Sequence, residues 1–477
     1  MVAFNKNDQV YARIFLVNFS YLAAGDLIAK ILAFWAFAHI ARILGTELFG
    51  DLGFAVAFTL YFRLIVSQGL DVYGIQEVAR DRSLVSTRGA GIFGLRLASS
   101  LAAAAALVAA VSLIDKSPNV KALLLLYGLT LVTTAVSFQW VFQAAERMSR
   151  VAVANVLGQL VFAVLVLLIL KRPDQLLWIP VLQVAGEIAS CLYFFVGFVR
   201  DFGPVRAVFD WRQWREILRE SLPMGLSGVL SLVMFNFDLV LLGFLKPASD
   251  VGQYSAAYKI IGFFSSFVLL FNRNLLPSVS RCRGNPSMLR RISDRVQKYA
   301  LLLTVPLAAG GSLLSRPLMH AIFGSQFAHG ATALAIILWV IPISSIRVLY
   351  RTTLVSHGLQ NYSLYASSIA VFLNVSLNLV LIPRFSYVGA AVATLVSESL
   401  LLVLTFAGVF RKVARLPIAG HMWKPAVASL VMAIFVTRVQ SAGVIATILG
   451  GALIYAIVAG PVLKAFDWKE VKSAIGA

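Results

Sequence analysis

Several ionisable side chains lie inside long apolar stretches of this chain, where a charge is costly unless it pairs with another group or faces water. The acidic members are Asp26, Glu187, Asp238 and Glu398, and the basic members are Lys30, Arg63, Arg96, Lys259 and Arg273. Buried cations suit the binding of an anionic group, and buried carboxylates suit the binding of a proton or a metal cation. We therefore treat the basic set as candidate substrate-binding residues and the acidic set as candidate ion-coupling or cavity carboxylates.

Depth within the apolar stretch separates two groups of these residues. Asp26 and Lys30 lie near the middle of the first stretch, four residues apart, where one helix face brings them into pairing distance. Glu187 and Glu398 also lie near the middle of their stretches. The remaining charges except Arg273 lie only about seven residues, roughly 10 Å, from an end, and a long cationic side chain can extend to the surface from there. Arg273 lies closer still to the cytoplasmic end of its stretch. Two interpretations stay open for every one of them: a pair that links helices, or a group that faces a cavity.

No motif for catalysis or for a cofactor accompanies these charges. The sequence contains no HExxH motif, P-loop or nucleophile elbow, and no polar loop with paired carboxylates. We therefore expect a protein that is not an enzyme, without catalytic residues, a metal or a cofactor.

The apolar stretches themselves predict an all-α polytopic membrane protein. The chain is 60% hydrophobic and only 13% charged, with a mean hydropathy of +0.85. Each stretch has about 20 apolar residues, enough to cross the hydrocarbon core of a bilayer. About fourteen of them are predicted, near residues 14–40, 48–69, 89–114, 121–144, 151–170, 176–199, 221–245, 253–277, 299–322, 330–350, 362–383, 387–410, 422–440 and 443–463.

Positive charge is concentrated on every second connection between these stretches. The net charge of +20 comes largely from basic clusters such as residues 200–219, 281–298 and 411–424. Cytoplasmic loops carry such an excess of Lys and Arg, so we expect both termini in the cytoplasm. Short basic loops beside apolar stretches also fit anionic membrane lipids as partners, and they exclude nucleic acid as the explanation of the charge.

The order of the stretches predicts four parts of the chain. Residues 1–200 and 221–410 each hold six predicted helices, and weak internal similarity at offsets near 202 and 211 suggests parallel repeats around a central cavity. Residues 201–220 contain apolar positions at helical spacing with arginines between them, from Val208 to Leu222, which predicts an amphipathic cytoplasmic linker. Residues 411–477 hold two additional transmembrane helices and a cytoplasmic tail.

Five segments follow one another along about 1–410: ARILGTELFG (41–50), FQWVFQAAER (138–147), VGQYSAAYK (251–259), NVSLNLVLIP (374–383) and GAAVAT (389–394). In this order they resemble the Wzx-type polysaccharide flippases, which export O-antigen and exopolysaccharide units and belong to the multidrug/oligosaccharidyl-lipid/polysaccharide (MOP) exporter superfamily. The resemblance implies two six-helix lobes around a V-shaped cavity, followed by a helix pair.

The resemblance also implies the activity. A member of this family would move an oligosaccharide on undecaprenyl pyrophosphate from the cytoplasmic to the outer leaflet of the bacterial inner membrane by alternating access. Lys30, Arg63, Arg96, Lys259 and Arg273 would then supply a cationic groove for the pyrophosphate. The partners that the resemblance implies are a polysaccharide polymerase and a chain-length regulator of the same pathway.

Three alternatives remain open. A MATE-type antiporter moves mostly cations, and its cavity should be net acidic, whereas the charges inside the stretches here are mixed. A lipid II flippase needs a cationic cavity as well, so charge does not separate it from the leading interpretation. A membrane-embedded glycosyltransferase or polymerase needs a large polar loop that this chain lacks.

Overall fold

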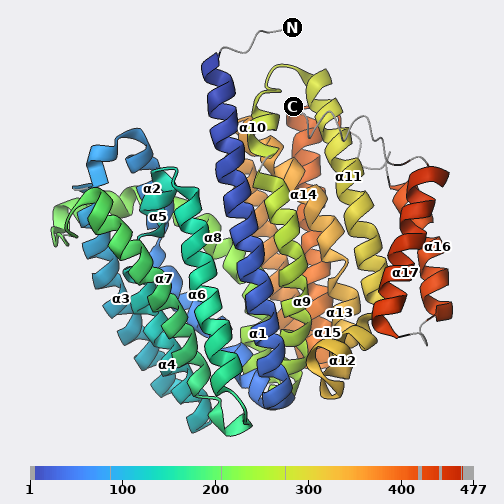
Figure 1. Cartoon of the computed structure of the whole chain (residues 1–477), viewed down its shortest axis with the longest axis horizontal. Coiled ribbons are helices and arrows are strands. Elements are labelled where there is room, and N and C mark those ends of the chain that lie inside the picture. The colour runs from blue at the N-terminus through green and yellow to red at the C-terminus, as the bar shows by residue number, and fades with distance from the viewer. Residues whose placement is uncertain are drawn as a thin grey trace. The chain divides into compact units, whose positions relative to one another are not determined.

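The structure is a computed structural model that describes the backbone of residues 6–463 and 465, apart from 86, 206, 274, 417–421 and 440–442. Every regular element in the described part is a helix (Figure 1). The all-α prediction is therefore confirmed. The chain divides into two compact units, Met1–Gly243 and Phe244–Ala477.

The first unit is built from eight helices in the part of the chain that is described. They are α1 Lys6–Ser67, α2 Leu70–Arg80, α3 Arg88–Leu113, α4 Pro118–Ala135, α5 Gln139–Ala144, α6 Met148–Ile169, α7 Trp178–Phe202 and α8 Trp211–Leu245. α1 packs along α3, α4 and α6, and α7 packs on α4 and α6. Predicted stretches one to seven all lie in these helices, although stretch four is divided between α4 and α5.

A single residue bends the long helix α1. Gly45 has φ 74° and ψ −179° inside an otherwise helical run of 62 residues. A positive φ is easily adopted only by glycine, because it has no Cβ to meet the backbone. This is the glycine of the ARILG motif, and it joins predicted stretches one and two without a loop.

The helix α8 belongs to the first unit, which differs from the expected division of the chain. We expected a linker at 201–220 and the second lobe from 221, yet the units divide after Gly243. Close backbone approach explains the difference: a Cβ on Gly69, which lies between α1 and α2, would be 2.3 Å from the carbonyl oxygen of Ser221. Near its other end, Gly243 packs directly against the Phe54 ring. Glycines at both points let α8 lie against the first unit.

The predicted amphipathic segment forms the start of α8. Its helix begins at Trp211, not at Val208, and continues through Pro223 to Leu245 instead of ending as a separate element. Ile217 is buried, and Trp214 and Leu218 pack against the same hydrophobic cluster of the first unit. The arginines of the segment, Arg212, Arg215 and Arg219, are exposed. The two faces of the segment are as predicted, but its apolar face lies partly on protein.

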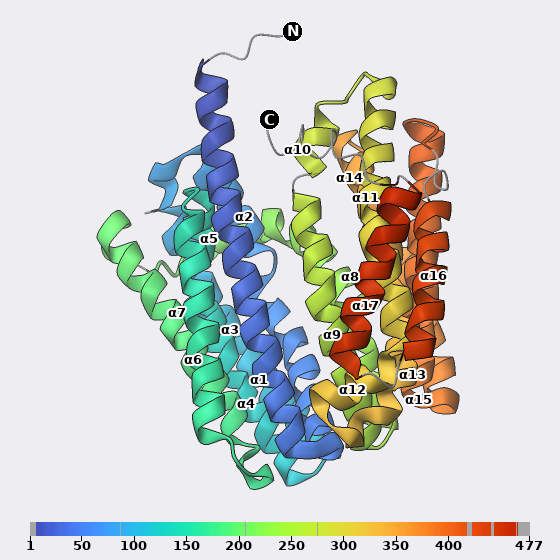
Figure 2. The same cartoon turned by 45° about the vertical axis from the view of Figure 1, so that its right-hand side comes forward.

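The second unit contains nine helices in its described part, ending in a helix pair. They are α9 Ala248–Arg273, α10 Leu275–Ser280, α11 Pro286–Leu313, α12 Ser315–Phe323, α13 Ala331–Ile337, α14 Val340–Ser356, α15 Gln360–Lys412, α16 Trp423–Val439 and α17 Val444–Ile457. The 53-residue α15 bends at Ser386, where φ is 51°. In both views α16 and α17 lie together beside α11 (Figure 2). The two additional C-terminal helices are therefore present, and the predicted tail lies outside the described residues.

Several of the described helices are long and apolar enough to span a membrane. Within the described residues, nine segments pass on length and composition, or ten if the pair α11–α12, bent by 79°, counts as one. Two of the nine, Tyr21–Arg80 and α15, have 60 and 53 residues. Straight helices of that length would measure about 90 and 80 Å, far more than the roughly 30 Å of a bilayer core. Each therefore supplies two crossings around its bend.

Candidate functional site

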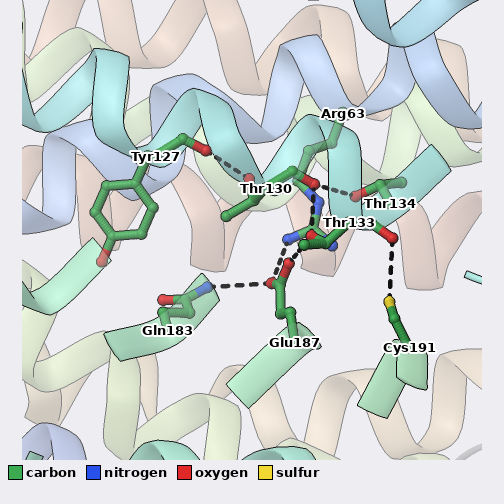
Figure 3. Close-up of polar contacts among 8 residues, drawn as sticks. All are labelled: Arg63, Tyr127, Thr130, Thr133, Thr134, Gln183, Glu187 and Cys191. Carbon is green, nitrogen blue, oxygen red and sulfur yellow. Dashed lines mark hydrogen bonds and ion pairs between the residues drawn. The ribbon is translucent and has the colours of Figure 1, made fainter. Parts of the chain in front are cut away.

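The carboxylate of Glu187 lies at the centre of a polar cluster inside the first unit (Figure 3). Arg63, from the second half of α1, donates from Nη1 to Glu187 Oε1 at 3.3 Å. Gln183, one turn earlier on α7, donates to the same oxygen at 3.5 Å. Thr133 of α4 donates to the other oxygen, Oε2. Three helices thus converge on one carboxylate.

Hydrogen bonds along α4 extend this cluster. The Thr133 hydroxyl also lies 3.0 Å from the carbonyl oxygen of Thr130, and Cys191 donates from Sγ to the Thr133 carbonyl at 3.4 Å. A hydroxyl carries one hydrogen, so Thr133 donates either to Glu187 or to Thr130 at a given moment. When Glu187 is ionised, donation to the carboxylate is favoured because bonds to a charged acceptor are stronger. The hydrogen-bond pattern therefore depends on the protonation of Glu187.

Arg63 retains capacity for a further ligand. A guanidinium group has five N–H donors in a fixed planar arrangement. Among the described residues, the structure gives Arg63 one hydrogen bond, to Glu187, and its side chain is 33% exposed. The remaining donors can bind a second anionic group, and a planar guanidinium binds phosphate oxygens in pairs.

The second unit contains a comparable pair that is almost entirely buried. Arg347 of α14 donates from Nε to Glu398 Oε2 of α15 at 2.7 Å. The Glu398 side chain is 1% exposed and that of Arg347 is 11% exposed. Both midplane carboxylates named from the sequence are therefore bound to an arginine, Glu187 in a partly exposed pair and Glu398 in a nearly buried one.

Arg96 is placed differently from the groove that the sequence suggested. Its side chain is 2% exposed, and it pairs with Asp71 of α2 and donates to the Ser137 carbonyl at 3.0 Å. These contacts hold α3 against α2 and the connection between α4 and α5. Such burial favours a role in linking helices.

The other predicted residues lie in the expected helices but outside both pairs. Asp26 and Lys30 are partly exposed on α1, one turn apart. Asp238 is buried in α8. Lys259 is partly buried in α9. Arg273 ends α9, and its side chain lies outside the described residues. The structure therefore leaves their substrate and coupling roles as predictions.

Arg347 and Thr133 are among the contributors that were not named from the sequence. Arg347 was within predicted stretch 330–350, three residues from its end, and so resembled a surface cation. The helix in fact continues to Ser356, which places Arg347 about 13 Å from the helix end at 1.5 Å per residue. An arginine within an apolar run was the available signal. The sequence holds no comparable signal for Thr133, because the hydroxyl of a threonine in a helix usually donates a hydrogen bond to a backbone carbonyl of the same helix.

Solved structures define the class of this fold. The lipid II flippase MurJ, in an inward closed conformation, superposes with a TM-score of 0.75 at 16% identity, covering 96% of this chain and 99% of that one. An inward-facing MATE family multidrug resistance transporter of the MOP superfamily superposes with a TM-score of 0.62 at 15% identity, covering 81% of this chain and 96% of that one. The fold is that of MOP superfamily transporters.

The family follows from the sequence. Residues 15–282, more than half of the chain, match the family described as polysaccharide biosynthesis protein, and the chain belongs to it. Residues 223–380 also match the MatE family. The resemblance drawn from the five motifs is therefore confirmed at the level of family and fold.

Curated relatives match parts of the chain. The probable flippase AglR of Haloferax volcanii is 26% identical over 236 residues, which are 46% of this chain and 49% of AglR. The putative O-antigen transporter of Shigella dysenteriae is 22% identical over 295 residues, 60% of this chain and 72% of that protein. The chain thus spans about half the length of AglR, and 34% of the probable low-salt glycan biosynthesis flippase Agl15 of H. volcanii.

Proposed function

We propose that this protein is a flippase for lipid-linked oligosaccharides, working by alternating access in the bacterial inner membrane with both termini in the cytoplasm. The observation that carries the proposal is Arg63, a partly exposed guanidinium with donors to spare, held by Glu187 inside an apolar helix bundle. A cation in that position suits the phosphate groups between lipid and sugar. The relatives named as flippases and O-antigen transporters support the same class of substrate.

The substrate that we propose is an oligosaccharide on undecaprenyl pyrophosphate, moved from the cytoplasmic to the outer leaflet. Each hydroxyl without a hydrogen-bond partner costs about 4–8 kcal/mol to bury in alkane, so a sugar head cannot cross unaided. The lipid tail can remain in the bilayer, so the protein has to bind only the head. Lys30, Lys259 and Arg273 are further cations proposed for this task, and Asp26 would balance Lys30 one turn away.

The test is flipping of a fluorescent, pyrophosphate-linked oligosaccharide in proteoliposomes at substrate below saturation. Arg63→Gln should slow flipping about tenfold or more, since hydrogen bonds to charged groups contribute about 1.5–3 kcal/mol. Arg63→Lys should keep part of the rate because it keeps the charge. Arg172→Gln, which removes an arginine whose side chain is 71% exposed, is the matched control and should have no effect.

A double variant separates binding from balance of charge. If Arg63 only neutralises Glu187, then Arg63→Gln combined with Glu187→Gln should restore full flipping. Restoration to the parental rate, or a single Arg63→Gln variant as active as the parent, would contradict the proposal.

A cation antiporter is the second candidate, favoured by the MatE match over residues 223–380. Against it, the described arginines Arg63 and Arg347 neutralise the carboxylates of Glu187 and Glu398. Export of ethidium from loaded proteoliposomes, together with unchanged distribution of the fluorescent oligosaccharide lipid, would favour the antiporter. Flipping of lipid II with no flipping of the shorter oligosaccharide lipid would instead favour a lipid II flippase.

A further inference from the structure

A groove with an apolar wall and a cationic end runs between α6 and α7 on the first unit. Its volume is about 470 Å³. Leu157, Leu192 and Val196 form the apolar wall, and Arg150 and Arg200 lie at one end. Leu192 and Val196 are each 59% exposed. None of these residues belongs to the Glu187 cluster.

Helical spacing explains why the apolar wall and the two arginines lie on the same faces of α6 and α7. On α7, Leu192, Val196 and Arg200 follow one another at intervals of four residues, which places them on one face over about 12 Å. On α6, Arg150 and Leu157 are seven residues apart and also share a face. Arg150 is near the start of α6 and Arg200 is near the end of α7. The two helices therefore place their cations at the same end of the groove.

Arg150 is held in position before any ligand binds. It pairs with Asp201, and its guanidinium carbon lies 5.6 Å from the centre of the Phe142 ring. Gly197 provides the space, because a Cβ at that position would lie 3.1 Å from Arg150 Nη1. A fixed cation loses little conformational entropy on binding, which favours affinity.

The charge at this end of the groove is not balanced. Asp201 accepts ion pairs from both Arg147 and Arg150. Arg200 is exposed, and among the described residues it has no ion-pair partner. Three cations and one carboxylate leave a net charge of +2 beside an apolar wall. A ligand that satisfies both features must be anionic at one end and apolar along the rest.

We propose that this groove binds one anionic glycerophospholipid of the surrounding leaflet. Its phosphate lies between Arg150 and Arg200, and an acyl chain lies along Leu157, Leu192 and Val196. A soluble phosphate compound would leave the apolar wall unused, and a neutral lipid would leave the cations unused. The inference does not depend on the proposed transport function.

The test measures lipid binding to the full-length protein in neutral detergent by native mass spectrometry. Dioleoyl phosphatidylglycerol should bind more tightly than dioleoyl phosphatidylcholine, whose choline group cancels the phosphate charge. Arg200→Gln should weaken phosphatidylglycerol binding about fivefold, which corresponds to about 1 kcal/mol per cation at a membrane surface. It should not change phosphatidylcholine binding. Arg200 is chosen because its substitution breaks no ion pair within the described part of the protein.

Two matched controls make the result specific to the groove. Arg212→Gln removes an exposed cation on α8 and should leave phosphatidylglycerol binding unchanged. Ala189→Trp fills the groove and should abolish the preference for phosphatidylglycerol, whereas Leu168→Trp, on an exposed part of α6, should preserve it. The thermal unfolding midpoint of each variant checks that it is folded.

Three outcomes would overturn the proposal. An equal loss of phosphatidylglycerol binding in Arg212→Gln and Arg200→Gln would show diffuse attraction by surface charge. Unchanged preference in Ala189→Trp would show that the apolar wall takes no part. Displacement of phosphatidylglycerol by millimolar inorganic phosphate would show an ion site without lipid specificity.

Discussion

Arg347 donates to Glu398 across α14 and α15 at 2.7 Å, and the carboxylate is 1% exposed. The pair in the first unit has the same chemistry with different surroundings, since Arg63 and Glu187 are 33% and 23% exposed. An arginine in a nearly buried pair cannot leave its carboxylate to bind a ligand at low cost, because the carboxylate would then remain buried without a counter-charge. Arg347 and Glu398 therefore hold the helices of the second unit together, while Arg63 remains reachable.

The first prediction concerns the stability of these pairs. Glu398→Gln leaves the Arg347 charge buried without its counter-charge, and breaking a buried pair in this way costs about 3–5 kcal/mol. Replacing both residues, as Arg347→Met with Glu398→Gln, removes both charges and should recover most of the loss. The midpoint of thermal unfolding in detergent is the measurement.

Glu187→Gln is the control in this comparison, because its arginine partner can be solvated. Its unfolding midpoint should fall less than that of Glu398→Gln. Equal midpoints for the two single variants would mean that burial does not distinguish the pairs.

The second prediction concerns the bend in α1. Gly45→Ala places a Cβ at φ 74° and ψ −179°, a conformation that is essentially restricted to glycine and costs other residues about 1–3 kcal/mol, so the unfolding midpoint should decrease. Gly228→Ala in α8 is the matched control: its added Cβ has open space, and alanine favours a helix interior by about 1 kcal/mol. A Gly45→Ala protein as stable as the parent would show that the bend does not need glycine.

Much of the fold was predictable because a bilayer imposes simple rules on sequence. The apolar stretches agree with helices such as α3, α6 and α7 to within a few residues. The bends at Gly45 and Ser386 were less accessible, since the same apolar pattern fits two helices with a loop or one bent helix. The packing of α8 on the first unit depends on close contacts at Gly69 and Gly243. These contacts join residues far apart in the sequence, so a local sequence pattern does not predict them.

The charged residues of the candidate site could be predicted from the sequence, but the ion pairs that they form could not. Glu187, Glu398 and Arg63 were named because ionisable groups are rare in apolar stretches. Which residues meet depends on how the helices pack, so the pairing of Arg63 with Glu187 and of Arg347 with Glu398 needed the structure. Arg96 was named by the same rule, and its partner Asp71 lies on a short helix outside the apolar stretches.

The third prediction concerns topology. The segments near residues 46, 118, 172 and 248 lie on the side with fewer cations, so reporter fusions there should show an outer location. Fusions at both termini and within 200–220 should report the cytoplasm. A cytoplasmic signal at two or more of the four outer positions would falsify the fourteen-span topology.

The last prediction concerns the driving force for transport. A pyrophosphate head with about two negative charges moves outward along the membrane potential, which releases about 2.3 kcal/mol per charge at about 100 mV. A protein with net positive charge at its binding site then returns inward along the same potential. We therefore expect flipping in proteoliposomes to increase with an imposed voltage, inside negative, and to need no pH gradient.

Glu187 offers the competing route, because its hydrogen bonds from Thr133 and Arg63 change when it takes up a proton. Under voltage-driven transport, Glu187→Gln alters the rate but keeps its dependence on voltage, since the charge of the substrate is unchanged. Under proton coupling, flipping follows the pH gradient, ignores voltage, and stops in Glu187→Gln or Glu398→Gln. Rates must be normalised to folded protein, because Glu398→Gln is also expected to destabilise the second unit. Voltage and pH gradients imposed separately on the parent and on Glu187→Gln therefore distinguish the two mechanisms.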